Sequence, residues 1–455
     1  MIKNHDELHE ECGVVAIWGD DNAAQLTYYG LHSLQHRGQE AAGIVVRNNK
    51  RKLNIHKGEG LVSEVFDKEK IKKLSGNAAI GHVRYSTAGG GGIMNVQPFL
   101  FRTLDGMMGI AHNGNIVNAN SLKKELEENG SIFNSTSDTE VIGHLIKRET
   151  GRFVDRICKS LEKIDGAFAF VILVEDALYV ARDRYGLRPL SMGRLPSGGY
   201  MFSSETCALD IAGAEFVRDV EPGEIIRVKD GIIKSKKYTE TLPICNKLCA
   251  MEYIYFSRPD SNLDGINVHT ARKTCGKTLF EEAPVEADLV IGVPDSSISA
   301  AIGYSEASGI PYEMGLIKNK YVGRTFIQPT QEMRERGVRM KLSAVSSIVK
   351  GKRVIMIDDS IVRGTTSKRI VKLLKEAGAT EVHVRIASPA IKFPCFYGVD
   401  ISTLEELISH RMNVEELCQF IEADSLAFIS MEGLKKSVKH DIDGNCDLCM
   451  SCFSG

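Results

Sequence analysis

The segment VIMIDDSIVRGTTS, from Val354 to Ser367, restricts the possible folds of this chain more than any other. Four apolar residues at its start predict a buried strand, which ends at the acidic pair Asp358 and Asp359. A loop containing Gly364 follows, and hydroxyl residues then open a helix. In open parallel sheets ligands bind at the carboxyl ends of strands, and a helix N-terminus presents backbone N–H groups to phosphate. The segment therefore predicts an α/β domain with a site for a phosphorylated ribose.

The two aspartates limit what this site can bind besides phosphate. Because carboxylates repel phosphate, Asp358 and Asp359 are expected to bind ribose hydroxyls or a Mg²⁺ ion shared with a diphosphate. A second loop, GVPDSS, also follows a predicted strand, and its Ser296 is a candidate neighbour of the metal. The phosphate contacts are assigned to Arg363, Gly364, Thr365, Thr366 and Ser367. The simpler alternative is a capped strand-to-helix turn with two solvent-facing aspartates.

Basic residues are concentrated between these two loops, in the segment from Lys318 to Lys341. Such a segment suits a lid that closes over a polyanion. Its residues Lys320, Tyr321 and Arg324 are the ones expected to contact the diphosphate. A charge run is more often a solvated surface, so that alternative stays open.

Two kinds of secondary-structure pattern divide the chain. Up to about residue 240, short β-rich stretches alternate with a few helical ones, and the run from Gly166 to Asp183 predicts two strands joined by a turn. This pattern indicates an α+β domain with antiparallel pairs. From about Thr270, strands alternate with amphipathic helices, as expected for a parallel sheet with right-handed crossovers. The stretch from Thr403 to Lys439 is predicted to be helical.

Length and composition support two domains and exclude several classes of protein. A chain of 455 residues exceeds the usual size of a single hydrophobic core. Its 57 basic and 59 acidic residues leave no charge excess that would favour a nucleic-acid partner. No apolar run approaches the roughly 18 residues of a membrane-spanning helix, and the polar N-terminus is unlike a signal peptide. We therefore expect a cytoplasmic protein without membrane or nucleic-acid partners.

Cys12 begins the β-rich sequence CGVVAIWG, after eleven mostly polar residues that have no evident structural use. If residues 1–11 are a removable propeptide, the freed α-amine of Cys12 can act as the base that activates its thiol. The alternative is a cysteine buried in a strand, which is the commoner role of a lone cysteine. Other segments of the chain decide between these two readings.

Three later segments contain the side chains that a pocket for an amino acid requires. HVRYSTAG offers Arg84 for an α-carboxylate, and STSDTE offers Asp138 for an α-ammonium. AHNGNI offers the side chain of Asn113 and the N–H of Gly114. These two donors suit the oxyanion that forms when a thiolate attacks an amide. With Cys12, the segments describe a site for an amino acid with a side-chain amide.

These motifs resemble those of a known family when they are taken in series. Cys12, QHRGQE at Gln35–Glu40, HVRYST, HNGNI and SDTE resemble the class II glutamine amidotransferase domain. The segment that starts at Val354 resembles the phosphoribosyltransferase signature. Their combination, together with CAMEYIYFSRPDSNLDG at Cys249–Gly265, resembles the amidophosphoribosyltransferases over nearly the whole chain.

The resemblance implies a particular organisation of the chain. A propeptide at 1–11 would precede an α+β N-terminal-nucleophile glutaminase domain at 12–240, with stacked antiparallel sheets between helices. An α/β type I phosphoribosyltransferase domain with a parallel sheet would occupy 250–400. A helical C-terminal segment at 401–455 would carry cluster cysteines.

It also implies the reaction. The chain would make 5-phosphoribosylamine from phosphoribosyl diphosphate and glutamine, as the first step of de novo purine (IMP) biosynthesis. Glutamate and diphosphate would be released, and ammonia would pass between the two active sites. Cys12, Asn113 and Gly114 would be catalytic, Arg84 and Asp138 would bind glutamine, and one Mg²⁺ would be bound by Ser296, Asp358 and Asp359. Feedback by purine nucleotides and a homotetramer are further expectations.

Eleven cysteines are too few for a disulfide scaffold, but three of them fall close together near the C-terminus. Cys249, Cys395, Cys449 and Cys452 stand where cluster-bearing members of the family place the ligands of a [4Fe–4S] cluster. Spacing alone suits Zn²⁺ as well. Cys446 and Cys245 are possible competitors for these ligand positions.

Two alternatives for the function remain. A different class II amidotransferase, such as a sugar-phosphate aminotransferase or an asparagine synthetase, would need another signature after residue 240. A purine-sensing regulator could keep a phosphoribosyl fold without catalysis. It would normally carry a basic DNA-binding module, whereas this chain has the series Cys12, Arg84, Asn113 and Asp138.

Overall fold

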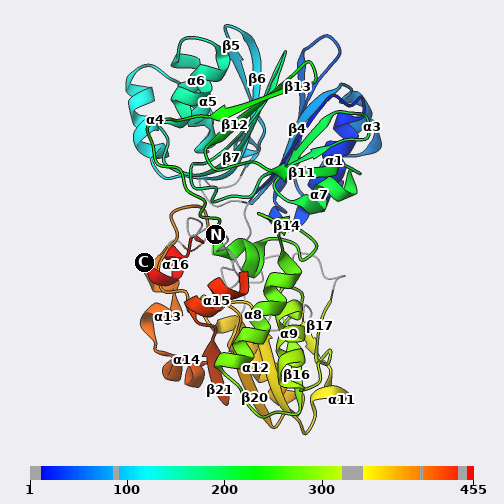
Figure 1. Ribbon diagram of the computed structural model, residues 1–455, viewed down its shortest axis with the longest axis vertical. Coiled ribbons are helices and arrows are strands. Elements are labelled where there is room, and N and C mark those ends of the chain that lie inside the picture. The colour runs from blue at the N-terminus through cyan, green and yellow to red at the C-terminus, as the bar shows by residue number, and fades with distance from the viewer. Residues whose placement is uncertain (1–11, 86–91, 320–341, 400, 402, 439–447) are drawn as a thin grey trace.

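The structure is a computed structural model that describes residues 12–85, 92–319, 342–399, 401, 403–438 and 448–455. Two lobes lie one above the other in Figure 1, and the chain passes once from the first lobe to the second. The first lobe contains the antiparallel sheets and the second contains a parallel sheet. This arrangement confirms the fold expected from the sequence.

Two antiparallel sheets form the centre of the first lobe. Within the described residues, the first sheet has the spatial order β11 (Glu215–Asp219), β9 (Ser191–Arg194), β10 (Tyr200–Ser203), β1 (Gly13–Trp18), β4 (Ala78–Arg84), β2 (Ala41–Arg47) and β3 (Leu53–Glu59). The second has the order β13 (Ile232–Lys237), β12 (Glu224–Lys229), β8 (Leu178–Arg182), β7 (Gly166–Val174), β6 (Gly106–Ile116) and β5 (Phe99–Thr103). The predicted pair of strands between Gly166 and Asp183 is β7 and β8.

Alternation along the strands explains how these sheets stack. Val14 and Ala16 of β1 pack with Ala169 of β7 between the two sheets. Val15 and Ile17 point the other way and contact the helix α1 (Ala23–Ser33). The outer face of the second sheet is covered by three helices: α4 (Ala119–Glu128), α5 (Thr139–Arg148) and α6 (Phe153–Leu161). The first lobe is therefore a sandwich of two sheets between two layers of helices.

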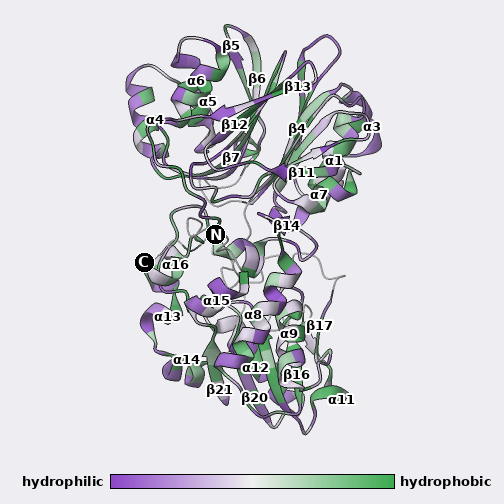
Figure 2. Cartoon of the chain, viewed as in Figure 1, coloured by the Kyte–Doolittle hydropathy of each residue, from purple (hydrophilic) through white to green (hydrophobic). Residues whose placement is uncertain are grey.

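The second lobe is built on four parallel strands, as far as the described chain shows. Their order is β16 (Leu289–Gly292), β19 (Arg353–Asp358), β20 (Glu381–Ile386) and β21 (Ser425–Phe428). Helices α8 (Val268–Glu282) and α9 (Ile298–Ser308) cover one face, and α12 (Thr365–Glu376) covers the other. Hydrophobic residues gather along the strands, whereas the exposed helix α3 (Lys68–Lys73) is hydrophilic (Figure 2).

One element differs from the sequence-based expectation. The stretch 403–438 is mainly helical, with η4 (Leu404–Glu406), α13 (Ile408–Arg411), α14 (Val414–Phe420) and α15 (Met431–Val438). Ser425–Phe428, however, is a strand at the edge of the parallel sheet. Periodicity cannot separate a four-residue strand from a turn of helix, so its pairing with β20 decides its conformation.

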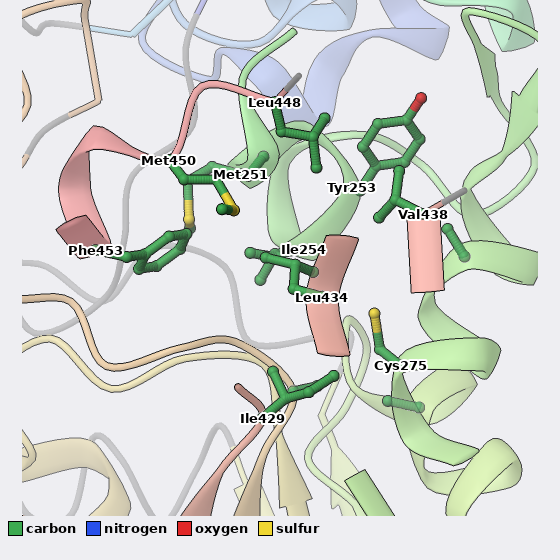
Figure 3. Packing of buried hydrophobic residues seen from close by; sticks show 14 of the residues in the cluster. Met251, Tyr253, Ile254, Cys275, Ile429, Leu434, Val438, Leu448, Met450 and Phe453 are labelled. Atoms are coloured by element: carbon green, nitrogen blue, oxygen red, sulfur yellow. The ribbon is translucent and has the colours of Figure 1, made fainter. Parts of the chain in front are cut away.

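The remaining elements are short. They are η1 (Gln35–Arg37), α2 (Val62–Val65), η2 (Ile93–Asn95), α7 (Thr206–Ile211), η3 (Glu252–Phe256), β14 (Asn262–Leu263), β15 (Ile266–Asn267), β17 (Leu316–Lys318), β18 (Leu342–Ala344), α11 (Ser346–Val349) and α16 (Ser451–Ser454). Figure 3 shows how η3, α15 and the C-terminal residues pack together through Met251, Ile254, Leu434, Met450 and Phe453. In the described chain, no helix is both long and apolar enough to span a membrane.

Candidate active sites

The predicted nucleophile lies beside the predicted carboxylate-binding residue. Cys12 directly precedes β1, whose Gly13 pairs with Val83 of β4. Arg84 is the last residue of β4 and is buried. The Cys12 thiol lies 3.7 Å from the carbonyl oxygen of Tyr85. Strand pairing therefore brings Cys12 and Arg84 together, although more than seventy residues separate them in the chain.

Asn113 lies in β6 of the second sheet and is fully buried. Its Nδ2 donates to the Ser204 hydroxyl at 3.4 Å, and this hydroxyl accepts the N–H of Val14 at 3.0 Å. Asn113 Oδ1 has no hydrogen-bond partner among the residues described. Ser204 thus fixes the predicted oxyanion donor close to the start of β1. No motif in the sequence pointed to Ser204.

Gly114 requires glycine for two reasons. Its φ of +141° lies in a region that side chains disfavour. A Cβ atom here would also lie 2.0 Å from the carbonyl oxygen of Ala167 in the neighbouring strand β7. The close approach of two strand backbones therefore fixes the position of the Gly114 N–H.

Asp138 stands directly before α5, and one carboxylate oxygen accepts the N–H of Ile116 at 2.9 Å. His112 approaches the same oxygen to 3.7 Å and lies 3.1 Å from the Thr139 hydroxyl. Burial lowers the pKa of His112, so its imidazole is neutral near pH 7. His112 lies in β6, the strand that carries the predicted oxyanion donors, and contacts the loop that carries Asp138. The sequence did not reveal this role of His112.

Glu140 sets the shape of the loop that carries Asp138. Its carboxylate accepts the N–H groups of Asn134 and Ser135 and the Ser135 hydroxyl. Burial opposes ionisation of this carboxylate, but the nearby His144 and hydrogen bonds from Ser135 and the backbone lower its pKa to about 2. Glu140 therefore stays charged and holds the loop at neutral pH.

In the second lobe, the acidic pair ends β19 as predicted, and both aspartates are buried. The Ser296 hydroxyl donates to Asp359, and the Ser297 hydroxyl donates to Asp358 at 3.2 Å. The two loops of the predicted site therefore meet at the carboxyl ends of β16 and β19. A small cavity here is lined by Ile254, Arg272, Cys275, Ser296, Ser297, Ala300, Asp359 and Ala387.

The loop after β19 has the geometry of a helix-terminal anion site. Gly364 has a φ of +74° and caps α12, which begins at Thr365. The buried Thr365 hydroxyl has no partner among the described residues, and Ser367 is buried. Arg363 forms an ion pair with Glu406 at 2.7 Å. The predicted lid residues Lys320, Tyr321 and Arg324 lie outside the described residues.

The four predicted cluster cysteines come together in the structure, since Cys395, Cys449 and Cys452 all act electrostatically on Cys249. Cys249 and Cys449 form a parallel bridge in which the Ala250 N–H donates to Cys449 at 3.1 Å. Burial raises the pKa of the Cys249 thiol, and Cys449, Cys395 and Cys452 raise it further, against the effect of Arg188. Cysteine thiolates are the donors that iron–sulfur clusters use, so the residue types present suit this group.

The predicted propeptide, residues 1–11, and the competing Cys446 lie outside the described residues. The other possible competitor, Cys245, is half-buried. No three His, Cys, Asp or Glu side chains in the described chain are close enough to hold a single metal ion.

Comparison with known sequences defines the class of protein. Residues 89–210 match the glutamine amidotransferase domain, and residues 270–389 match the phosphoribosyl transferase domain. The first range includes Asn113, Gly114 and Asp138, and the second includes Ser296 and the acidic pair. The fold and its two sites therefore define a glutamine amidotransferase joined to a phosphoribosyl transferase.

Full-length relatives identify the family. The amidophosphoribosyltransferase of Bacillus subtilis (strain 168) is 60% identical, over 100% of this chain and 95% of that protein. That of Staphylococcus aureus (strain Mu50) is 55% identical, over 99% of this chain and 92% of the relative. The chain belongs to the amidophosphoribosyltransferase family.

Solved structures agree with this assignment. The glutamine phosphoribosylpyrophosphate amidotransferase of B. subtilis, complexed with ADP and GMP, has a TM-score of 0.92 and 59% identity, covering 98% of this chain and 96% of that one. A structure described as the allosteric regulatory enzyme of purine biosynthesis has a TM-score of 0.93 and 60% identity, covering 98% of this chain and 95% of that one.

Proposed function

We propose that the chain catalyses the amidophosphoribosyl transfer of its family through two sites that share ammonia. In the first lobe, the Cys12 thiolate attacks the side-chain amide of glutamine, and Asn113 and Gly114 donate to the oxyanion. Ammonia leaves as a thioester forms, and water then releases glutamate. Arg84 and Asp138 bind the α-carboxylate and α-ammonium. The contact between Cys12 and Tyr85 is the observation that carries this half of the proposal.

In the second lobe, phosphoribosyl diphosphate places its 5′-phosphate on the loop Arg363–Ser367, and Lys320, Tyr321 and Arg324 cover the diphosphate. Ammonia attacks C1 of the ribose, and diphosphate leaves. The product, 5-phosphoribosylamine, begins purine biosynthesis. The positive φ of Gly364 and the buried hydroxyls of Thr365 and Ser367 at the start of α12 support this assignment, because a helix N-terminus with such groups suits a phosphate.

The oxygen atoms of Ser296, Asp358 and Asp359 fit a Mg²⁺ ion, because hard cations prefer carboxylate and hydroxyl oxygens. When bound, the ion would neutralise charge on the leaving diphosphate. The chain's own contribution is orientation: Ser296 and Ser297 hold the two carboxylates at the end of β19.

A [4Fe–4S] cluster on Cys249, Cys395, Cys449 and Cys452 would act as a structural tie between distant segments. Cysteines that bind different irons can be spaced more widely than the ligands of one ion, which favours the cluster over Zn²⁺. The Cys395 loop also contacts the first lobe, since Asn115 Nδ2 donates to the Phe396 carbonyl at 2.9 Å. Arg188 donates to the Tyr397 carbonyl at 2.7 Å.

Further parts of the proposal concern processing, regulation and location. Removal of residues 1–11 would free the α-amine of Cys12, and the glutaminase and phosphoribosyltransferase domains would span 12–240 and 250–400. Purine nucleotides would inhibit, as the ADP and GMP in the B. subtilis relative suggest. A cytoplasmic homotetramer is the expected assembly.

The test is a balance of products. Purified protein with glutamine, Mg²⁺ and phosphoribosyl diphosphate should release glutamate and diphosphate in equal amounts, and ammonium salts should replace glutamine. A purine-sensing regulator would instead be stabilised by phosphoribosyl diphosphate or nucleotides without turnover. Binding without release of either product would exclude the enzymatic proposal.

A further inference from the structure

A buried arginine joins the two lobes. Arg37 lies in η1 of the first lobe and is completely buried. Its guanidinium donates to Glu205, which precedes α7 of the same lobe. On the other side it forms an ion pair with Glu252, which begins η3 after the crossing between lobes, and donates to Ser257 at 3.0 Å. We call Arg37, Glu205, Glu252 and Ser257 the junction network.

The junction network is charged but well paired. Both carboxylates are fully buried, and Glu205 also accepts the Ser261 hydroxyl at 2.6 Å and the Arg258 N–H at 2.9 Å. A buried ion pair is stable only when its geometry is good and its other donors and acceptors are satisfied. The network therefore favours one relative position of the lobes and penalises others.

The first-lobe end of the network reaches the glutamine site. Gly38 follows Arg37 and packs so tightly on Arg84 that a Cβ atom would lie 2.6 Å from the Arg84 backbone. The Glu40 N–H also donates to the Arg84 carbonyl at 3.1 Å. A shift of Arg37 would therefore move the backbone of Arg84. Arg84 directly precedes Tyr85, whose carbonyl oxygen contacts the Cys12 thiol.

The second-lobe end reaches the phosphoribosyl site. Arg272 of α8 donates to the carbonyls of Tyr253 and Ser257, at 2.6 and 2.8 Å, and so fixes both ends of η3. Arg272 also lines the small cavity that Ser296 and Asp359 line. The segment that carries Glu252 therefore packs against the loops that hold the acidic pair.

We propose that Arg37 and Glu252 are positioning residues that keep the glutamine site in register with the phosphoribosyl site, so that ammonia released at one is captured at the other. This inference rests on the proposed function. Each half-reaction has its own catalytic groups, so loss of register should waste ammonia and leave each half-reaction in place.

The experiment compares Arg37→Met, Glu252→Gln, the double variant and Ser257→Ala. The measured quantity is glutamate released per phosphoribosylamine formed, which is one for perfect transfer. It should rise to about two or more in the charge variants, while activity with ammonium salts stays within about twofold of the parent protein. Arg156→Met is the matched control, because Arg156 is buried and paired with Asp105 inside the first lobe; its ratio should stay at one.

Several outcomes would overturn the inference. A ratio of one in the double variant and in Ser257→Ala would do so, as would an equal rise in Arg156→Met. If removal of one charge prevents folding, the double variant removes both charges of the Arg37–Glu252 pair together, and Glu205 keeps His36 as a hydrogen-bond partner at 2.7 Å. Ser257→Ala keeps both charges and removes one hydrogen bond of the junction network. Its ratio of glutamate to phosphoribosylamine is expected to rise by at least about a third. If the charge variants do not fold, this ratio alone tests the inference. Failure of the proposed function would give a different result from failure of this inference. In that case the parent protein itself would not release glutamate and diphosphate in equal amounts.

Discussion

The Cys12 thiol lies 3.7 Å from the carbonyl oxygen of Tyr85, the residue after Arg84. This contact joins the two ends of the predicted glutamine site, because Cys12 would attack the side-chain amide and Arg84 would hold the α-carboxylate. It follows from the antiparallel pairing of β1 with β4. The predictions below start from this site.

Replacement of Cys12 by alanine should abolish turnover with glutamine and leave turnover with ammonium salts, since only the first half-reaction uses the thiol. Diphosphate release with each nitrogen donor measures both activities. Cys158→Ala, at a buried position among helices of the same lobe, is the control. Loss of both activities in Cys12→Ala alone would contradict the two-site scheme.

Asp358→Asn should reduce turnover with glutamine and with ammonium salts alike, by about a hundredfold or more, because both need bound phosphoribosyl diphosphate. Asp288→Asn is a matched control at the opposite end of the sheet, where Asp288 pairs with Arg353 at 3.1 Å. Unchanged activity of Asp358→Asn would refute the role of the acidic pair.

Protein purified without oxygen should be brown and contain about four irons and four sulfides per chain. Cys452→Ser should lower the iron content and the visible absorbance, since it removes one of the four ligands. Cys275→Ser, a buried cysteine facing the core, should leave both unchanged. Colourless protein that contains zinc would rule out the cluster.

Gly114→Ala should lower glutamine-dependent turnover by roughly 10²–10³-fold, the effect of losing one oxyanion donor. The added Cβ would lie 2.0 Å from the Ala167 carbonyl oxygen, so strand β6 must shift. Turnover with ammonium salts is the readout for the intact second lobe and should remain. Gly130→Ala, at an exposed turn with open space around it, tests the effect of positive φ alone.

Acid should destabilise the first lobe through His82. Burial, with the charges of Arg84 and His112, lowers the pKa of His82 to about 3, whereas an unfolded histidine titrates near about 6.5. The unfolded chain therefore binds the extra proton first, and stability falls as pH drops below about 6.5, by up to about 1.4 kcal/mol per pH unit.

The measurement is urea unfolding at about pH 7 and about pH 5, followed by the fluorescence of Trp18, the single tryptophan, which lies in this lobe. In His82→Gln, the free energy of unfolding should depend less on pH, by the slope that corresponds to about one bound proton. His410→Gln, at an exposed helix position, should keep it. Equal slopes in all three proteins would show that His82 does not control the acid response.

Most helices, strands and motifs could be predicted from short stretches of sequence. The strand, acidic pair and helix of 353–376 are encoded within one short segment, and the structure places them as expected. The strand Ser425–Phe428 was missed, because its conformation depends on pairing with β20. Ser204 was missed for the same kind of reason, and so were the roles of His112 and Arg37, although both residues lie in motifs quoted above. Their partners are distant in sequence, so no spacing rule could reveal these contacts.

The sequence by itself determined which chemical groups are present and in which local setting: a cysteine before a strand, a Gly–Thr loop before a helix, and four cysteines in three separate segments. Only the tertiary structure decided how these groups meet. Backbone pairing sets the distance between Cys12 and Tyr85, and a buried guanidinium links Arg37 to Glu252 across the lobes. Such contacts depend on the packing of the whole core, in which every element must fit its neighbours at once.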